Sequence, residues 1–290
     1  MVDPDYCAVF TVDVEDWYHG IELPASRWSG LEHRLSVGLD ALLQLLSDHG
    51  TRGTFFTLGW IAERYPAVVR RIAAGGHELA SHGYSHEKVY RLTPEQFRDE
   101  VRRTKQLIES ISGQPIVAHR SPYFSITRDS LWALEILREE GYSCDCSISP
   151  VQTWRYGIPG SPDRAYRISD VDLVEFPISV TRLLSKKLGI GGAWFRILPA
   201  RITERALDHL LTRDRQAIFY AHPWEYDPDH PVVRDIDVRA GLTHYFNLKS
   251  TLPKTERLLR RFRFQTLAEA VSRLQARDAI LDYSLDRLRN

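Results

Sequence analysis

Short apolar runs alternate with helical patterns through most of the chain, and this alternation limits the fold more than any other feature of the sequence. Between the first two runs, Leu35, Leu39, Leu42 and Leu46 recur at helical spacing, and the pattern stops at Gly50. Strands are predicted at 7–12, 53–58, 77–81, 116–119, 142–146, 173–176, 217–221 and 263–265. Strands separated by helices pair in parallel, so an α/β fold follows, either a barrel or a doubly wound sheet.

Helix boundaries have local signals of their own. A helix over 66–74 ends at a Gly-Gly pair, and another begins with Thr93 as N-cap and Pro94 at the first helical position, with Gln96 completing a capping box. That helix is expected to end near Gly113. Further helices are predicted at 127–140, 201–213 and 251–262, a long loop at 147–167, and a solvated closing helix at 276–290.

The residues that follow the first strand favour the barrel. An open nucleotide-binding sheet carries a glycine-rich phosphate loop at this position. Here the strand is followed by Asp13-Val14-Glu15-Asp16-Trp17 instead. The barrel is therefore the preferred architecture.

Polar groups follow five of the predicted strands. In parallel α/β folds the carboxyl ends of the strands converge, and chemistry collects there. Each group alone has an ordinary structural explanation, such as a helix cap, a surface ion pair or a core histidine. Their joint placement indicates one functional rim, made of Asp13, Glu15, Asp16, His82, Arg120, Asp145 and His222.

His82 and His86 have the spacing of a metal site. Two imidazoles four residues apart can face one ion when the segment forms a helical turn, and imidazole is a common ligand for zinc-like metals. Taken alone, such a pair is more often found as surface or capping histidines. The surrounding rim is what favours a divalent metal.

Composition excludes several classes of protein. Lys+Arg and Asp+Glu number 38 each, so the chain has no net positive charge that would attract nucleic acid. No apolar run reaches the roughly 18 residues of a spanning helix, and residues 1–6 lack the pattern of a signal peptide. A cytoplasmic protein without a transmembrane segment is expected. The three cysteines cannot form a disulfide framework, and Cys144 and Cys146 are expected as buried free thiols.

Five segments occur in an order that is similar to a known family. They are 11–17 (TVDVEDW), 82–86 (HGYSH), 120–123 (RSPY), 142–149 around Asp145, and 219–225 (FYAHPWE). This pattern resembles the metal-dependent polysaccharide deacetylases of carbohydrate esterase family four, the NodB-type homology domain. The resemblance covers nearly the whole chain and implies a distorted (β/α) barrel of seven to eight mostly parallel strands.

Four linking segments resemble a subgroup of that family found with bacterial exopolysaccharide and exosortase loci. These segments are 53–59 (GTFFTLG), 76–82 (GHELASH), 156–159 (YGIP) and 191–196 (GGAWFR). The resemblance implies a single domain over 1–290, in which 225–290 is a family-specific C-terminal extension that includes 245–248 (YFNL).

The resemblance also implies the roles of the metal and the base. His82 and His86, with one carboxylate, would hold a divalent ion, Zn²⁺ first, with Co²⁺ or Ni²⁺ as alternatives. Asp13 would be the general base, oriented and kept ionised by Arg120. The third ligand stays open. Strand alternation puts Glu15 on the face of Asp13, whereas a turn starting at Val14 would let Asp16 reach the metal instead.

The remaining implied roles concern the acid and the oxyanion. His222 would be the general acid, with Asp145 holding its tautomer. The N–H of Tyr123 would help hold the oxyanion, while its neighbour Pro122 has no N–H to donate. The tryptophan expected close behind Asp145 is absent. Trp154 or Trp194 is expected to replace it, Trp194 and Trp224 are candidates for stacking on sugars, and Arg196 and Glu225 are candidates for hydroxyl contacts.

The implied function is removal of N-acetyl groups from amino sugars of a bacterial exopolysaccharide or its lipid-linked precursor. The partners would be an N-acetylated oligo- or polysaccharide and membrane-bound polysaccharide assembly machinery. Two alternatives are an amide hydrolase of a non-polysaccharide substrate, allantoinase-like, and a non-catalytic carbohydrate-binding protein. The complete set of acid, base and ligand residues argues against the non-catalytic reading.

Overall fold

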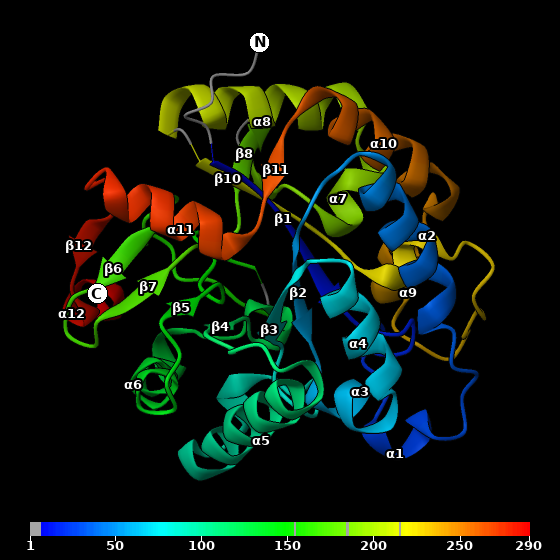
Figure 1. Cartoon of the computed structure of the whole chain (residues 1–290), viewed down its shortest axis with the longest axis horizontal. Coiled ribbons are helices and arrows are strands. Elements are labelled where there is room, and N and C mark those ends of the chain that lie inside the picture. Colours follow the sequence, from blue (N-terminus) through cyan, green and yellow to red (C-terminus); the bar gives the residue numbers. More distant parts are fainter. Residues whose placement is uncertain (1–6, 154, 184–185, 215) are drawn as a thin grey trace.

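A computed structural model describes residues 7–153, 155–183, 186–214 and 216–290 (Figure 1). Ten of its strands form one curled sheet with the order β10-β1-β2-β3-β4-β5-β7-β6-β12, and β11 pairs with β1. Their bounds are β1 Cys7–Val14, β2 Thr54–Thr57, β3 Glu78–Ser81, β4 Ala118–His119, β5 Cys144–Asp145, β6 Tyr166–Ile168, β7 Leu173–Glu175, β10 Gln216–Ala221, β11 Phe264–Gln265 and β12 Leu281–Tyr283. The β8 (Val180–Leu183) and β9 (Lys186–Gly189) strands form a separate hairpin.

The expected fold class is confirmed. Every pair in the large sheet is parallel except β6 with β7. Within the described residues no ladder joins β10 to β12, so the barrel is distorted and incomplete. Each predicted strand has a counterpart in the sheet, although β4 and β5 keep only two paired residues each.

Helices cover the outer side of the curled sheet (Figure 1). Helix α4 has the predicted bounds. Helix α5 begins after Thr93, whose side chain accepts the Gln96 N–H at 3.2 Å, and it ends at Gly113 with φ 70°. The α-helices are α1 Ala25–Trp28, α2 Leu35–Asp48, α3 Gly59–Arg64, α4 Pro66–Ala74, α5 Pro94–Ser112, α6 Trp132–Glu139, α7 Gly192–Ile197, α8 Ala200–Asp214, α9 Val238–Tyr245, α10 Thr251–Arg261, α11 Leu267–Ala276 and α12 Leu285–Arg289.

Two helix predictions differ from the structure. The segment 127–140 divides into the 3₁₀ turn η3 (Arg128–Ser130) and helix α6. The prediction of a solvated closing helix at 276–290 is wrong, because this segment contains β12, which pairs with β6, and α12, whose Leu285 and Leu288 are buried. β12 pairs with a strand more than 100 residues earlier in the chain, and such a distant partner cannot be recognised from the neighbouring sequence.

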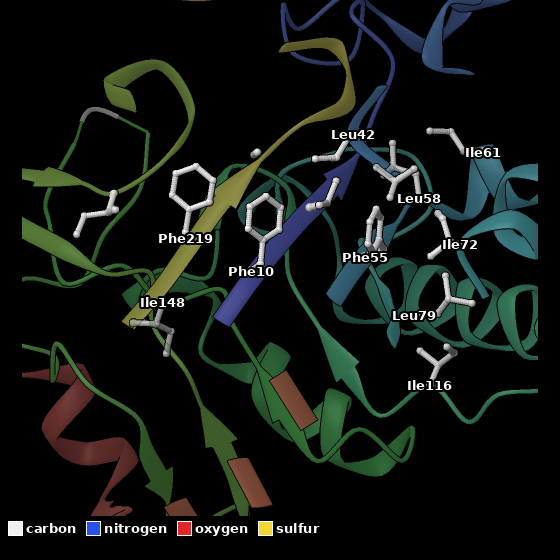
Figure 2. Packing of buried hydrophobic residues seen from close by; sticks show 14 of the residues in the cluster. Phe10, Leu42, Phe55, Leu58, Ile61, Ile72, Leu79, Ile116, Ile148 and Phe219 are labelled. Atoms are coloured by element: carbon white, nitrogen blue, oxygen red, sulfur yellow. The ribbon is translucent and has the colours of Figure 1, made fainter. Parts of the chain in front are cut away.

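Alternate residues of the strands enter two separate buried clusters. Phe10 and Phe55 face the helices, whereas their neighbours Val9 and Phe56 fill the barrel interior. Figure 2 shows Phe10, Phe55 and Phe219 on the adjacent strands β1, β2 and β10, and the Phe10 and Phe219 ring centroids are 5.3 Å apart. Side chains at odd-numbered positions of β1 therefore point into the barrel.

Among the described residues, no helix combines the length and the apolar character needed to cross a bilayer.

Candidate metal centre and active site

Five of the seven predicted rim residues, Asp13, Glu15, His82, Arg120 and His222, lie together at the carboxyl end of the sheet. Asp13 is on β1, and Glu15 follows that strand directly. The other three, His82, Arg120 and His222, come directly after β3, β4 and β10. Asp13, Glu15 and His222 line one cavity of about 170 Å³, whose walls also include Tyr123, Tyr156, Arg196 and Trp224.

One carboxylate oxygen of Glu15 lies between two imidazoles. Glu15 Oε1 is 3.1 Å from His82 Nε2 and 2.9 Å from His86 Nε2, and all three side chains are buried. Burial disfavours the charged carboxylate, but the neighbouring His86 and the bond to His82 outweigh it and hold the pKa of Glu15 well below its usual value.

The tautomer of His82 makes this cluster suitable for a cation. His82 Nδ1 lies 2.8 Å from the Arg120 carbonyl, which can only accept, so Nδ1 carries the proton. Nε2, which faces the Glu15 carboxylate, is then the ring atom that can offer a lone pair to a cation. The three ligand atoms lie within 4.8 Å of one another, and two imidazoles with one carboxylate form a typical zinc ligand set.

Asp16 lies elsewhere, in a structural position. Its Oδ2 accepts the N–H groups of Arg34 at 2.9 Å and Leu35 at 3.1 Å, at the start of α2, and lies 2.7 Å from His33 Nδ1. Of the two carboxylates left open as third ligand, Glu15 is the one beside the histidines, because β1 continues through Val14 without the turn that Asp16 would need. Alternation along the extended chain then sends Asp16 away from the histidines.

Asp13 is paired with a fully buried arginine. Arg120 Nη1 donates to Asp13 Oδ1 at 2.7 Å and to Thr11 Oγ1 at 3.0 Å. Its guanidinium carbon is 4.1 Å from the centroid of the Phe56 ring. A buried guanidinium with this pairing fixes the position of the carboxylate.

His222 is held by Glu225. His222 Nδ1 is 3.1 Å from Glu225 Oε2, and its Nε2 is 3.9 Å from Asp13 Oδ2. Glu225 is held in turn by Arg196, whose Nε donates to Oε1 at 2.7 Å. Burial alone would lower the pKa of His222, but Glu225 and the nearby carboxylates of Glu15 and Asp13 raise it to about 9.

Asp145 does not contact His222, so its expected partner is corrected. Asp145 accepts from the Ser147 hydroxyl at 2.6 Å and lies beside Glu175, which accepts the Ile148 N–H at 2.9 Å. Burial raises the pKa of Asp145 to about 6. Pairing of β5 between β4 and β7 keeps this carboxyl deep in the sheet.

Sequence reasoning missed the role of Glu225. A signal was available, since Glu225 follows His222 by three residues within one 3₁₀ turn, η4 (Pro223–Tyr226). Glu225 and Arg196, expected to contact sugar hydroxyls, instead form a buried ion pair.

The predicted aromatic residues differ in their surroundings. Trp224 is buried and stacks on His222 at 5.1 Å between ring centroids, whereas Trp194 on α7 is 40% exposed and does not line the cavity. Tyr123 packs on His86 and has a left-handed φ of 57° next to the buried Pro122. Trp154 lies outside the described residues.

Two family models match the chain. The model described as "Polysaccharide deacetylase" matches residues 35–143. The model described as "Domain of unknown function (DUF3473)" matches residues 146–272. The first range contains His82, His86 and Arg120, and the second contains Arg196, His222 and Glu225.

Individual proteins match over shorter stretches. A peptidoglycan-N-acetylglucosamine deacetylase of Bacillus cereus is 34% identical over 95 residues, 32% of this chain and 34% of the relative. A chitooligosaccharide deacetylase of Bradyrhizobium sp. is 35% identical over 91 residues, 31% of this chain and 42% of the relative. The matches to both relatives therefore span less than half of either protein's own length.

The fold has a counterpart among solved structures. A crystal structure from Mycobacterium smegmatis, described as a candidate polysaccharide deacetylase, superimposes with a TM-score of 0.65 at 18% identity. It covers 98% of this chain and 95% of its own. This likeness extends over both matched family regions and supports the barrel architecture.

Glu175 gives a prediction about stability and pH. Burial and the adjacent Asp145 raise the pKa of Glu175 well above its usual value, so the folded chain retains a proton that the unfolded chain releases near pH ~4. The stability that this group contributes is present at low pH and is lost as pH rises. Glu175→Gln, which keeps an acceptor for Ile148, should therefore lose less free energy of unfolding between pH 5 and 8 than the wild type.

Urea denaturation at pH 5, 6.5 and 8 measures this difference. Glu139→Gln, at a carboxylate 58% exposed, is the control and should follow the wild type. Parallel curves for Glu175→Gln and the wild type would show that Glu175 is ionised in the folded protein over this range.

Proposed function

We propose that this chain, which carries a polysaccharide deacetylase domain over residues 35–143, is a metal-dependent hydrolase that removes N-acetyl groups from amino sugars. As substrate we propose a bacterial exopolysaccharide or its lipid-linked precursor. One observation carries the proposal. Three groups meet at one end of the sheet: Glu15 between two histidines, Asp13 paired with Arg120, and His222 bound to Glu225.

Glu15, His82 and His86 would hold the metal. Their ligand atoms lie within 4.8 Å of one another, and two imidazoles with one carboxylate suit Zn²⁺, with Co²⁺ or Ni²⁺ as alternatives. When bound, the ion would polarise the acetyl carbonyl and make a water molecule more acidic. Asp16 is left out of this ligand set, because its oxygens serve the start of α2.

Asp13 would act as the general base. Arg120 donates to its carboxylate and orients it, so Asp13 would be placed to accept a proton from the attacking water. The second oxygen, Oδ2, lies 3.9 Å from His222 Nε2, so the proposed base and acid would act side by side on one substrate. The buried guanidinium cannot release a proton itself.

His222 would act as the general acid. The contact with Glu225 places the proton of Nδ1 towards that carboxylate and leaves Nε2 facing the cavity. A raised pKa keeps the imidazole protonated at neutral pH, so it can donate to the leaving amine. Arg196 holds Glu225 in place and is itself fixed by the carbonyls of Thr243, His244 and Phe246.

The backbone N–H of Tyr123 would help stabilise the developing oxyanion. The left-handed backbone at Tyr123 and Phe124 is a strained arrangement of the kind found at functional sites. Pro122 has no N–H and contributes by shaping this turn.

We further propose that residues 1–290 act as one domain. The sheet contains strands from both matched ranges, and β11 and β12 of the segment 225–290 pair with β1 and β6. The proposed compartment is the cytoplasm, where the described thiols Cys144 and Cys146 would stay reduced, as they are in the structure. Association with membrane-bound polysaccharide assembly machinery belongs to the same proposal, and co-purification from cell fractions would check it.

The direct test is acetate release from N-acetylated oligosaccharides with and without a chelator. We expect release that the chelator abolishes and added divalent metal restores. Asp13→Asn and His222→Ala should each lower the rate by about 10²–10⁴-fold while the fold survives. Chelator-resistant release, or near wild-type rates in both variants, would contradict the mechanism.

Glu15 and Asp16 should separate metal binding from stability. Glu15→Gln removes a charged ligand and should lower the metal content of the purified protein severely. Asp16→Asn should keep the metal and lose about 1 kcal/mol of stability from the weakened cap. Elemental analysis and thermal denaturation measure the two effects, and loss of metal in Asp16→Asn alone would reverse the assignment.

Glu225 and Asp145 should differ in their effect on the general acid. Glu225 raises the pKa of His222, so Glu225→Gln lowers that pKa, and the fall of activity on the alkaline side should move to lower pH. We expect a rate loss of about 10²-fold or more near pH 8. Asp145→Asn is the matched control and should leave the alkaline limb unmoved, whereas the opposite pattern would favour Asp145 as the partner.

A further inference from the structure

A groove lies on the outer wall of the barrel, between helix α8 and the β8–β9 hairpin (Figure 1). Its volume is about 420 Å³. No described residue lines both this groove and the active-site cavity. The groove belongs to residues 146–272, the region that matches the family model of unknown function, and the proposed mechanism gives it no role.

The lining of the groove carries an excess of positive charge. Arg182, Lys187 and Arg205 line it, and none of them pairs with a carboxylate of the residues that the structure describes. Asp163, the carboxylate in the described lining, is already bound to Arg213 at 3.2 Å. The chain as a whole has equal numbers of acidic and basic residues, so this excess is a local feature of the groove.

Helix α8 keeps its paired and unpaired charges on different faces. The residues that line the groove recur at helical spacing, at positions 202, 205, 206, 209, 210 and 213. On another face, Glu204 pairs with Arg257 and Arg261 of helix α10. Asp208 pairs with Arg261 as well. These two carboxylates are therefore engaged by α10, and Arg205 is left on the groove side without a counterion.

The hairpin places two of the cations directly opposite each other. In the antiparallel register of β8 and β9, Arg182 is the partner of Lys187. Side chains at partner positions lie on the same face of a hairpin, and like charges placed there destabilise it. An anion bound between the two side chains would remove this cost. The register is thus a second, independent indication of an anionic ligand.

The shape and the remaining lining of the groove indicate which anion fits. Val180, Ala206 and Leu210 are buried and form an apolar floor. The described lining contains no aromatic side chain, so the bases of a nucleic acid would find no stacking surface. Guanidinium groups bind phosphate through paired N–H donors. A phosphate group attached to an apolar chain therefore fits best, with the phosphate at the cations and the chain over the floor.

We propose that this groove binds the phosphate headgroup of an anionic lipid and so attaches the outer wall of the barrel to a membrane surface. Arg182, Arg205 and Arg213 are exposed, and a headgroup can reach them. Anionic headgroups attract Lys and Arg side chains near a bilayer, and the contributions of several cations accumulate. This role concerns a surface apart from the active site and does not depend on the proposed function.

Sedimentation of the full chain with vesicles tests the proposal. Vesicles of phosphatidylcholine alone are compared with vesicles in which part of it is replaced by phosphatidylglycerol. We expect at least about tenfold stronger binding to the anionic vesicles, lost at high salt because salt screens the charges. Arg182→Gln combined with Arg205→Gln should weaken this binding by about tenfold or more, since each cation near the surface contributes about fivefold.

A matched pair of substitutions controls for net charge. Arg260→Gln combined with Arg289→Gln removes the same charge at side chains 70% and 58% exposed, outside the groove, and should bind like the wild type. Arg182→Gln alone should keep or raise the melting temperature, because it removes the repulsion with Lys187. A residue that only supports the hairpin would lower it. Acetate release from soluble oligosaccharides should be unchanged in every variant.

Calorimetric titrations separate the lipid from other sources of phosphate. They compare a short-chain, monomeric phosphatidylglycerol with inorganic pyrophosphate and with a short DNA duplex. The lipid should bind at least about tenfold more tightly than pyrophosphate, which has no chain to cover the apolar floor. Equal or tighter binding of pyrophosphate or DNA would overturn the lipid assignment. Equal binding to both kinds of vesicle, or an equal loss in the control pair and the groove pair, would overturn the proposal.

Discussion

The rest of the site depends on the alternation of side chains along the central strand β1. This strand is buried between β2 and β10, so each residue must suit one of two enclosed environments. Phe10 packs towards the helices, whereas Thr11 and Asp13 point into the barrel and meet Arg120. Because the strand continues through Val14, the next inward position belongs to Glu15, which reaches the two histidines.

Burial explains why every carboxylate of the site has a defined partner. An isolated charge inside a protein is so costly that it must be paired or neutralised. Asp13 has Arg120, Glu225 has Arg196, and Asp16 has the free N–H groups that begin α2. Glu15 differs from these in lying between two imidazoles, His82 and His86, and this makes the three residues the candidate cation site.

The two matched family regions contribute different parts of one site. The polysaccharide deacetylase region carries the histidine pair and Arg120, while the region of unknown function carries His222, Glu225 and Arg196. Asp13 and Glu15 precede both. Neither region encloses the cavity alone, since Trp224 and Arg196 form one wall and His86 and Tyr123 form another. The region of unknown function, residues 146–272, therefore forms the part of the barrel that contributes His222, the proposed general acid.

Local interactions let the sequence by itself determine the α/β class, the ends of α4 and α5, and the rim of Asp13, His82, Arg120 and His222. Helix caps and hydrophobic periodicity depend on residues only a few positions apart, so they can be recognised in the sequence alone. Only the tertiary structure placed Glu225 rather than Asp145 at His222, paired β12 with β6, and brought Glu15 rather than Asp16 beside the two histidines. These outcomes depend on how far β1 extends and on which distant groups compensate each buried charge, and both are settled by packing across the whole barrel.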